Sequence, residues 1–130
     1  MDAKTSNYAV VLMPVPVERD LITLTLLRLG FQAVACKDII AAEEAIERQP
    51  VNILIIDVIL PGANGLDLVM DWKKKENMVN CKVIVYSAMR FPEYVSQAKL
   101  AGAVDFLIKP VELDVIIDRA KKWTTKIHYR

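Results

Sequence analysis

Three polar side chains of different chemistry each close an apolar run of the sequence. Asp57 follows four apolar residues, Ser87 ends a second run, and Lys109 ends a third. Together they offer an acid, a hydrogen-bond donor and a cation. An ionised carboxylate among apolar residues needs a cation or the open edge of a sheet, and Lys109 is its natural partner. Taken singly, each residue also has an ordinary explanation as a turn cap, an isolated hydroxyl or a solvated cation.

Five apolar runs rich in Val and Ile are predicted to be strands that are covered on both faces. They span residues 9–13, 31–36, 51–56, 82–86 and 104–108. Segments of helical period lie between them. Pro16 is expected to begin the first helix and Gly30 to end it, with Leu21, Leu24 and Leu27 or Arg28 marking its period.

The other helices carry comparable signals. Asp38 is a predicted N-cap for the second helix, the third follows Gly65, and the fourth runs from Pro92 to Gly102. The fifth shows the clearest apolar stripe, at i, i+3, i+4, i+7 and i+10. Its members are Leu113, Ile116, Ile117, Ala120 and Trp123. Trp72 and Trp123 are both expected to be half-buried.

Five β-α alternations predict an α/β fold with a doubly wound, five-stranded parallel sheet. Ligands of such sheets gather at the carboxyl ends of the strands. Because Asp57, Ser87 and Lys109 each follow a strand, we expect them to converge at that edge.

The composition describes one ordinary domain. The chain has 130 residues, 54% hydrophobic and 25% charged, with a net charge of +1. We expect a single domain over residues 1–130, with a core at about 8–123. Charge near zero gives no general attraction to nucleic acid or anionic membranes. The apolar stretches fall short of the ~20 residues that a membrane-spanning helix needs, and the expected location is cytoplasmic.

Cysteines and the basic C-terminal end carry weaker signals. Cys36 and Cys81 lack the spacing of a zinc site or a disulfide scaffold, so two buried thiols are expected. Residues 121–130 are basic and mildly aromatic, but lysines in the last turn of a helix also complement its dipole. Nucleic-acid binding is therefore not expected, and His128 has no visible partner.

Three motifs resemble the receiver domains of two-component response regulators. They are LIIDVILPGANG at 54–65, VIVYSA at 83–88 and GAVDFLIKP at 102–110. Their separations match those of the family, and the resemblance covers roughly residues 8–123. It implies a flavodoxin-like receiver fold, (βα)5, with strand order 2-1-3-4-5, and a cis peptide at Lys109-Pro110.

The resemblance also implies site roles. Asp57 would be the phosphoacceptor, attacking a phosphohistidine to form an acyl phosphate. Ser87 would donate a hydrogen bond to a phosphoryl oxygen, and Lys109 would neutralise another. Phe106 holds the place of the family's rotating switch aromatic, and its ordinary alternative is a core aromatic.

One departure weakens the expected metal site. The family ends its first strand with two acidic residues that bind magnesium, and here Met13 and Pro14 stand at that pair. Only Asp57 and the Ile59 carbonyl remain as ligands, so magnesium binding should be weak or absent and no cofactor is expected. Glu18 and Asp20 lie nearby on the following helix and are poor candidates for substitution. A direct Asp57–Lys109 ion pair is the expected resting state.

Two signalling interpretations stay open. The chain is either an atypical phosphorelay receiver with little magnesium dependence or a pseudo-receiver that binds proteins without phosphorylation. Enzyme alternatives fail: an aspartate-nucleophile phosphohydrolase needs a second Asp where Ile59 stands, and a flavin-binding protein needs a hydroxyl or glycine loop after the first strand.

The expected partners follow from the resemblance. They are a histidine kinase or phosphotransfer protein, and a downstream protein at the face of helix four, strand five and helix five, which also makes homodimers in the family. Residues expected on that face are Glu93, Tyr94, Gln97, Lys99 and Asp114.

Overall fold

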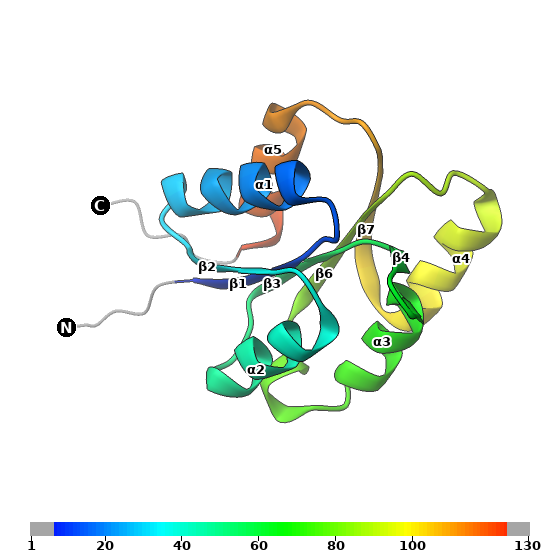
Figure 1. Ribbon diagram of the computed structural model, residues 1–130, viewed down its shortest axis with the longest axis horizontal. Helices are drawn as coiled ribbons and strands as arrows, with labels where there is room; N and C mark the ends of the chain where they lie inside the picture. Colours follow the sequence, from blue (N-terminus) through cyan, green and yellow to red (C-terminus); the bar gives the residue numbers. More distant parts are fainter. Residues whose placement is uncertain (1–6, 125–130) are drawn as a thin grey trace.

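The computed structural model describes residues 7–124, which form an α/β fold around one parallel sheet (Figure 1). The sheet order is β2-β1-β3-β6-β7. These strands are β1 (Tyr8–Leu12), β2 (Gln32–Cys36), β3 (Ile53–Ile56), β6 (Lys82–Ser87) and β7 (Ala103–Ile108). Renumbered without the two short strands β4 and β5, this is the predicted order 2-1-3-4-5.

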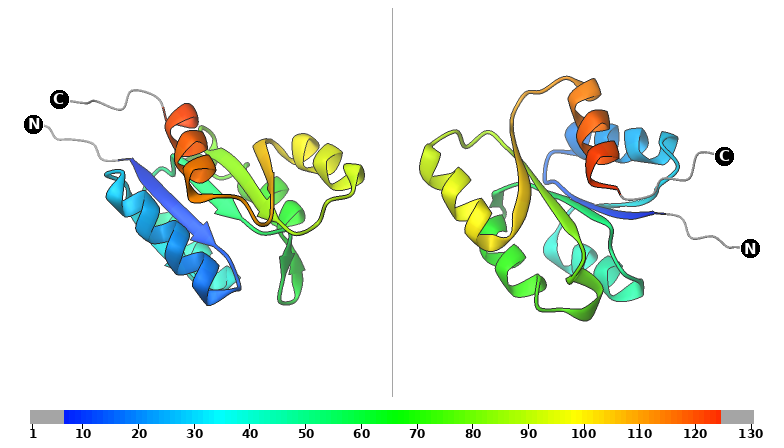
Figure 2. Two further views of the ribbon diagram at one scale, coloured as in Figure 1. Left: turned by 90° about the horizontal axis from the view of Figure 1, so that it is seen from above. Right: turned by 180° about the vertical axis from the view of Figure 1, so that it is seen from behind.

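Five helices cover the two faces of the sheet. They are α1 (Pro16–Arg28), α2 (Ile39–Arg48), α3 (Gly65–Trp72), α4 (Pro92–Ala101) and α5 (Leu113–Trp123), with a short 3-10 turn η1 at Glu76–Met78. Helices α1 and α5 lie on one face, and α2, α3 and α4 lie on the other, as the views in Figures 1 and 2 show. The doubly wound arrangement predicted from the sequence is confirmed.

The central strands are buried on both sides, which explains their continuous apolar runs. In β1, Val10 and Leu12 join the core beneath α2, α3 and α4, while Ala9 and Val11 join the core beneath α1 and α5. Successive side chains of a strand point to opposite faces. One strand therefore supplies apolar side chains to both layers.

The expected helix boundaries are largely confirmed. Pro16 occupies the first turn of α1, where its missing N–H costs nothing. The Asp38 carboxylate accepts a hydrogen bond from the Ala41 N–H at 2.9 Å and so caps α2. Gly102 ends α4 with φ 104°, in the left-handed region that favours glycine.

Several predicted burial patterns were wrong in detail. The leucines that marked the first helix, Leu21, Leu24 and Leu27, are 46–49% exposed, and Ile22 and Leu26 face the core instead. Because α1 is apolar on both sides, periodicity alone cannot choose its buried face.

Two further expectations were wrong in detail. Leu113 is exposed although it stood in the predicted apolar stripe of the fifth helix. Trp72 is buried rather than half-buried, and its indole N–H donates to Glu43 at 3.1 Å. Trp123 is half-buried as expected.

Both cysteines are free and buried, as predicted. Burial raises the pKa of the Cys36 thiol to about 11 and that of Cys81 to about 12. In the basic end of the chain, residues 125–130, including His128, lie outside the described residues. None of the helices within residues 7–124 is long and apolar enough to cross a membrane.

Candidate functional site

The carboxyl ends of three neighbouring strands bring the expected polar residues to one edge of the sheet. Asp57 directly follows β3, Ser87 is the last residue of β6, and Lys109 directly follows β7. The Lys109 Nζ lies 2.6 Å from Asp57 Oδ2, so the predicted ion pair is present. The Lys109 N–H also donates to the Ser87 carbonyl oxygen at 2.9 Å, which joins the ends of β6 and β7.

Asp57 is buried, with 5% of its surface exposed. Its Oδ1 accepts a hydrogen bond from the Ile59 N–H at 3.3 Å, and its own N–H donates to the Leu12 carbonyl oxygen. Charge-assisted hydrogen bonds of this kind compensate for the lost hydration of a buried carboxylate. Both oxygens of the acid are therefore held before any ligand arrives.

A short hairpin lies directly after Asp57. It pairs β4 (Ile59–Leu60) with β5 (Ala63–Asn64), and Gly65 follows it as the first residue of α3. A Cβ at Gly65 would overlap the Asp57 carbonyl oxygen, and the Gly65 N–H donates to the Val58 carbonyl oxygen at 2.6 Å. Only glycine permits this close approach of two backbones.

Lys109 is the electrostatic centre of the site. Its side chain is 12% exposed, and its Nζ lies 5.5 Å from the centre of the Tyr86 ring. Burial alone would lower the pKa of Lys109, but hydrogen bonds and charges from Asp57 and Glu18 outweigh it, and the pKa is raised. The ammonium form is therefore the resting state.

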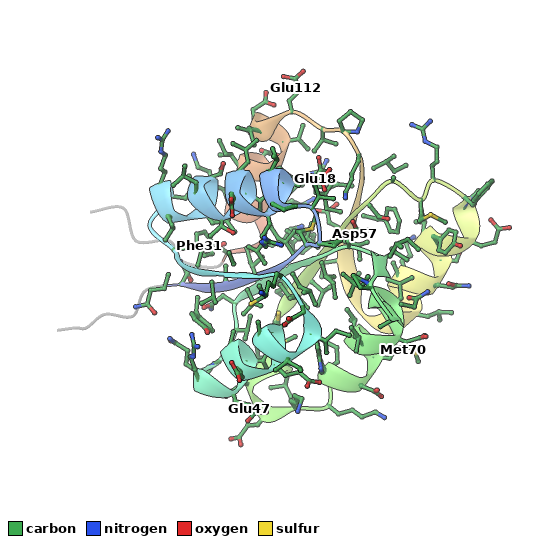
Figure 3. All side chains as sticks on the ribbon, viewed as in Figure 1. Glu18, Phe31, Glu47, Asp57, Met70 and Glu112 are labelled. Carbon is green, nitrogen blue, oxygen red and sulfur yellow. The ribbon has the colours of Figure 1, made fainter. Side chains whose placement is uncertain are left out.

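Glu18 is the residue whose contact the sequence did not predict. Its Oε1 lies 2.6 Å from Lys109 Nζ, so one ammonium binds two carboxylates. Figure 3 shows Glu18 at the start of α1 and Asp57 at the end of β3. The available signal was the position of Glu18 in the first turn of a helix that begins near the carboxyl end of β1. Asp20, two residues along, is exposed.

The end of β1 contributes no side-chain oxygen to this edge. Met13 is fully buried in the core beneath α1, and Pro14 is partly buried. The Met13 carbonyl oxygen accepts a hydrogen bond from Arg19 Nη1 at 2.9 Å. Across residues 7–124, no group of three or more His, Cys, Asp and Glu side chains is placed to hold a metal ion. Magnesium favours several oxygen ligands in octahedral geometry, and the side chains of Met13 and Pro14 offer none.

Ser87 is fully buried, and its Oγ accepts a hydrogen bond from the Met89 N–H at 3.2 Å. The hydroxyl hydrogen can still donate, because a serine hydroxyl has one donor and two acceptor positions. The hydroxyl therefore stabilises the loop after β6 while keeping its donor available. Its role toward a phosphoryl group stays a prediction.

Phe106 is partly buried and packs against the core beneath α4. It also lines a cavity of about 230 Å³ between α4 and β7, together with Val95 and Lys99. Three of the expected partner-face residues, Glu93, Tyr94 and Gln97, line a separate hollow of about 500 Å³ beside the hairpin. The Lys109-Pro110 peptide is cis, as the resemblance implied.

Many known proteins are similar to this chain in sequence or in structure. The family model for the response regulator receiver domain matches residues 15–121. The two-component response regulator ORR13 of Oryza sativa subsp. japonica is 28% identical over 110 residues, covering 84% of this chain and 91% of that protein.

Two crystal structures share the fold. A response regulator from Thermotoga maritima has a TM-score of 0.82 at 24% identity, covering 94% of this chain and all of that one. A response regulator receiver protein from Pseudomonas putida has a TM-score of 0.82 at 26% identity, covering 92% and 99%. With the strand order and the carboxylate–ammonium pair in place, this chain belongs to the response regulator receiver domains of two-component signalling.

Proposed function

We propose that Asp57 accepts a phosphoryl group from the phosphohistidine of a histidine kinase or phosphotransfer protein, with little or no help from magnesium. The observation that carries this proposal is the 2.6 Å contact between Asp57 Oδ2 and Lys109 Nζ, at the edge of a receiver sheet. A buried carboxylate that already contacts its cation is preorganised, since the two side chains need not be brought together during the reaction.

The transfer is an exchange of two bonds to phosphorus. A carboxylate oxygen of Asp57 bonds to phosphorus, the phosphorus–nitrogen bond of the phosphohistidine breaks, and the departing imidazole keeps the electron pair. Lys109 neutralises charge on the phosphoryl oxygens, and the Ser87 hydroxyl donates to one of them. Because phosphoryl transfer depends mainly on positioning and cations, a pocket with Lys109 as its cation is expected to react slowly.

Labelling with radioactive phosphate tests the proposal directly. Acetyl phosphate and a phosphorylated phosphotransfer protein are each incubated with the chain, with and without magnesium. We expect slow labelling that magnesium changes less than twofold and that Asp57→Asn abolishes. A strictly magnesium-dependent reaction, or label that persists in Asp57→Asn, would contradict the proposal.

A second test restores the acidic pair. Met13→Asp with Pro14→Asp places two carboxylates at the end of β1, and we expect magnesium to bind and to accelerate labelling by about tenfold or more. Met13→Leu with Pro14→Ala is the matched control without new charge. No gain in magnesium affinity would show that Met13 and Pro14 do not occupy the positions of the family's acidic pair.

The second candidate is a pseudo-receiver that binds its partner without phosphorylation. The observation favouring it is that Lys109 already binds two carboxylates, Asp57 and Glu18, in the resting state. Total absence of label from both donors, with partner binding unchanged in Asp57→Asn, would establish this candidate.

The output surface is proposed on the face of α4, β7 and α5. Lys99 and Phe106 line the cavity between α4 and β7, and Asp114 is exposed on α5. A downstream protein or a second copy of the chain is the proposed partner. Chemical-shift changes confined to this face on titration would support it.

A further inference from the structure

One ammonium at the pocket is shared between two carboxylates that come from different elements of the fold. Lys109 Nζ lies 2.6 Å from Asp57 Oδ2 and 2.6 Å from Glu18 Oε1. The Asp57 and Glu18 side chains are 7% and 31% exposed, respectively. Two negative charges against one positive charge leave this cluster with an excess of negative charge.

The two contacts differ in how readily they can be broken. Asp57 is further fixed by the Ile59 N–H and lies among buried strands. Glu18 lies in the first turn of α1, has one more rotatable bond than Asp57, and already reaches solvent. Turning Glu18 outward returns its carboxylate to water at low cost, whereas moving Asp57 would unpair a buried charge.

The Glu18 carboxylate also resembles the group that the pocket is proposed to receive. It presents a negatively charged oxygen to Lys109 at hydrogen-bond distance, as a phosphoryl oxygen would. An ammonium has three donors, so the limit is space and charge rather than the number of hydrogen bonds.

We propose that Glu18 is a positioning residue that occupies the oxyanion place on Lys109 and must swing away before a phosphoryl group can bind there. This inference rests on the proposed function, because the competing oxyanion is the group destined for Asp57. Glu18 lowers the affinity for the incoming anion both by competition for Lys109 and by repulsion. Its departure changes the cluster from net negative to neutral.

Glu18→Gln tests the proposal, since it keeps the length of the side chain and removes its charge. Asp20→Asn is the matched control, because Asp20 is exposed on the same helix and loses the same charge. The probe is beryllofluoride, followed through the amide resonances of Ser87 and Lys109. We expect Glu18→Gln to bind it about tenfold more tightly, and Asp20→Asn to stay within twofold of the unchanged chain.

A second measurement follows the amine itself. Reductive methylation of Lys109, quantified by mass spectrometry, is expected to accelerate severalfold in Glu18→Gln and not in Asp20→Asn. Glu18→Asp retains the charge but withdraws the carboxylate by one methylene, and it is expected to give intermediate values. If Glu18→Gln fails to fold, the inference is tested by comparing Glu18→Asp with Asp20→Asn in the same two measurements.

If Glu18→Gln and Asp20→Asn behave equally in both measurements, the inference is overturned. It is also overturned if neither the unchanged chain nor Glu18→Gln binds beryllofluoride. Failure of the proposed function is distinguishable. Label absent from Asp57 while Glu18→Gln tightens beryllofluoride binding would refute the phosphoacceptor role and support the Glu18 role. If Asp57 is labelled but Glu18→Gln leaves beryllofluoride binding unchanged, the phosphoacceptor role is supported and the Glu18 role is refuted.

Discussion

Asp57 and Asp105 are both held by a cation, but their surroundings differ. Asp105, in β7, accepts from Arg119 Nη1 at 2.8 Å and from Trp123 Nε1 at 2.6 Å, so both donors come from α5. Asp57 accepts from Lys109, which follows β7, and from the Ile59 N–H of the adjacent hairpin.

The difference shows how the same type of pair can serve structure or chemistry. Around Asp105, donors from one helix occupy both carboxylate oxygens, and the result is a fixed connection between α5 and the sheet. Around Asp57, the cation is shared with Glu18 from α1, so a third element can alter the pair. We therefore expect changes at Asp105 to affect stability alone and changes at Asp57 to affect stability and labelling together.

Lys109→Met is the change with the largest expected effect. It leaves Asp57 and Glu18 as neighbouring carboxylates without their cation, and breaking a buried pair in this way costs about 3 kcal/mol. Urea unfolding at pH 7 measures the loss, with exposed Lys121→Met as the control. Phosphoryl labelling should disappear as well. Unchanged unfolding free energy would mean that the Asp57–Lys109 pair contributes nothing to stability.

Arg119→Met removes the cation from Asp105, the carboxylate that is compared with Asp57. Asp105 keeps its hydrogen bond from Trp123, and the Arg119 side chain is 33% exposed, so the expected loss of unfolding free energy is about 1 kcal/mol. Labelling of Asp57 should stay within twofold of the unchanged chain. A larger fall in labelling would show that the Asp105 cluster is coupled to the pocket.

The smallest expected effect is a difference between Lys109→Met and the unchanged chain in how stability depends on alkaline pH. The pKa of Lys109 is raised in the folded chain, so its stabilising contribution is present below the unfolded-state pKa and is lost as pH rises through the folded-state value. Lys109→Met should therefore lose stability less steeply above pH ~10.4 than the unchanged chain.

Arg119→Met is the control for that measurement, because an arginine guanidinium stays charged across this range and its removal leaves the slope unchanged. The buried thiols of Cys36 and Cys81, whose pKa values are raised, contribute equally to all three proteins. Identical slopes for Lys109→Met and the unchanged chain would contradict the prediction.

The sequence predicted the fold and the central pair because both depend on short-range patterns. Apolar runs fixed which segments are strands, and the rule that parallel strands end at one edge placed Asp57 near Lys109 although they are 52 positions apart. Pro16, Asp38 and Gly102 marked helix ends through their own backbone preferences.

The remaining features depend on tertiary placement. The Glu18 contact joins residues 91 positions apart and requires the rotation of α1 about its axis. That rotation was ambiguous because α1 is apolar on both faces. The burial of Trp72 depends on α2, which supplies the acceptor Glu43. The hairpin of β4 and β5 is too short for a periodic signal.

The close approach of Gly65 to the Asp57 carbonyl oxygen places the first residue of α3 directly against the Asp57 backbone. Two backbones in direct contact leave no gap to absorb a displacement. A side chain at position 65 would have no room unless the first residue of α3 or the Asp57 peptide moved apart. The spacing between α3 and the Asp57 backbone therefore depends on the absence of a single Cβ atom.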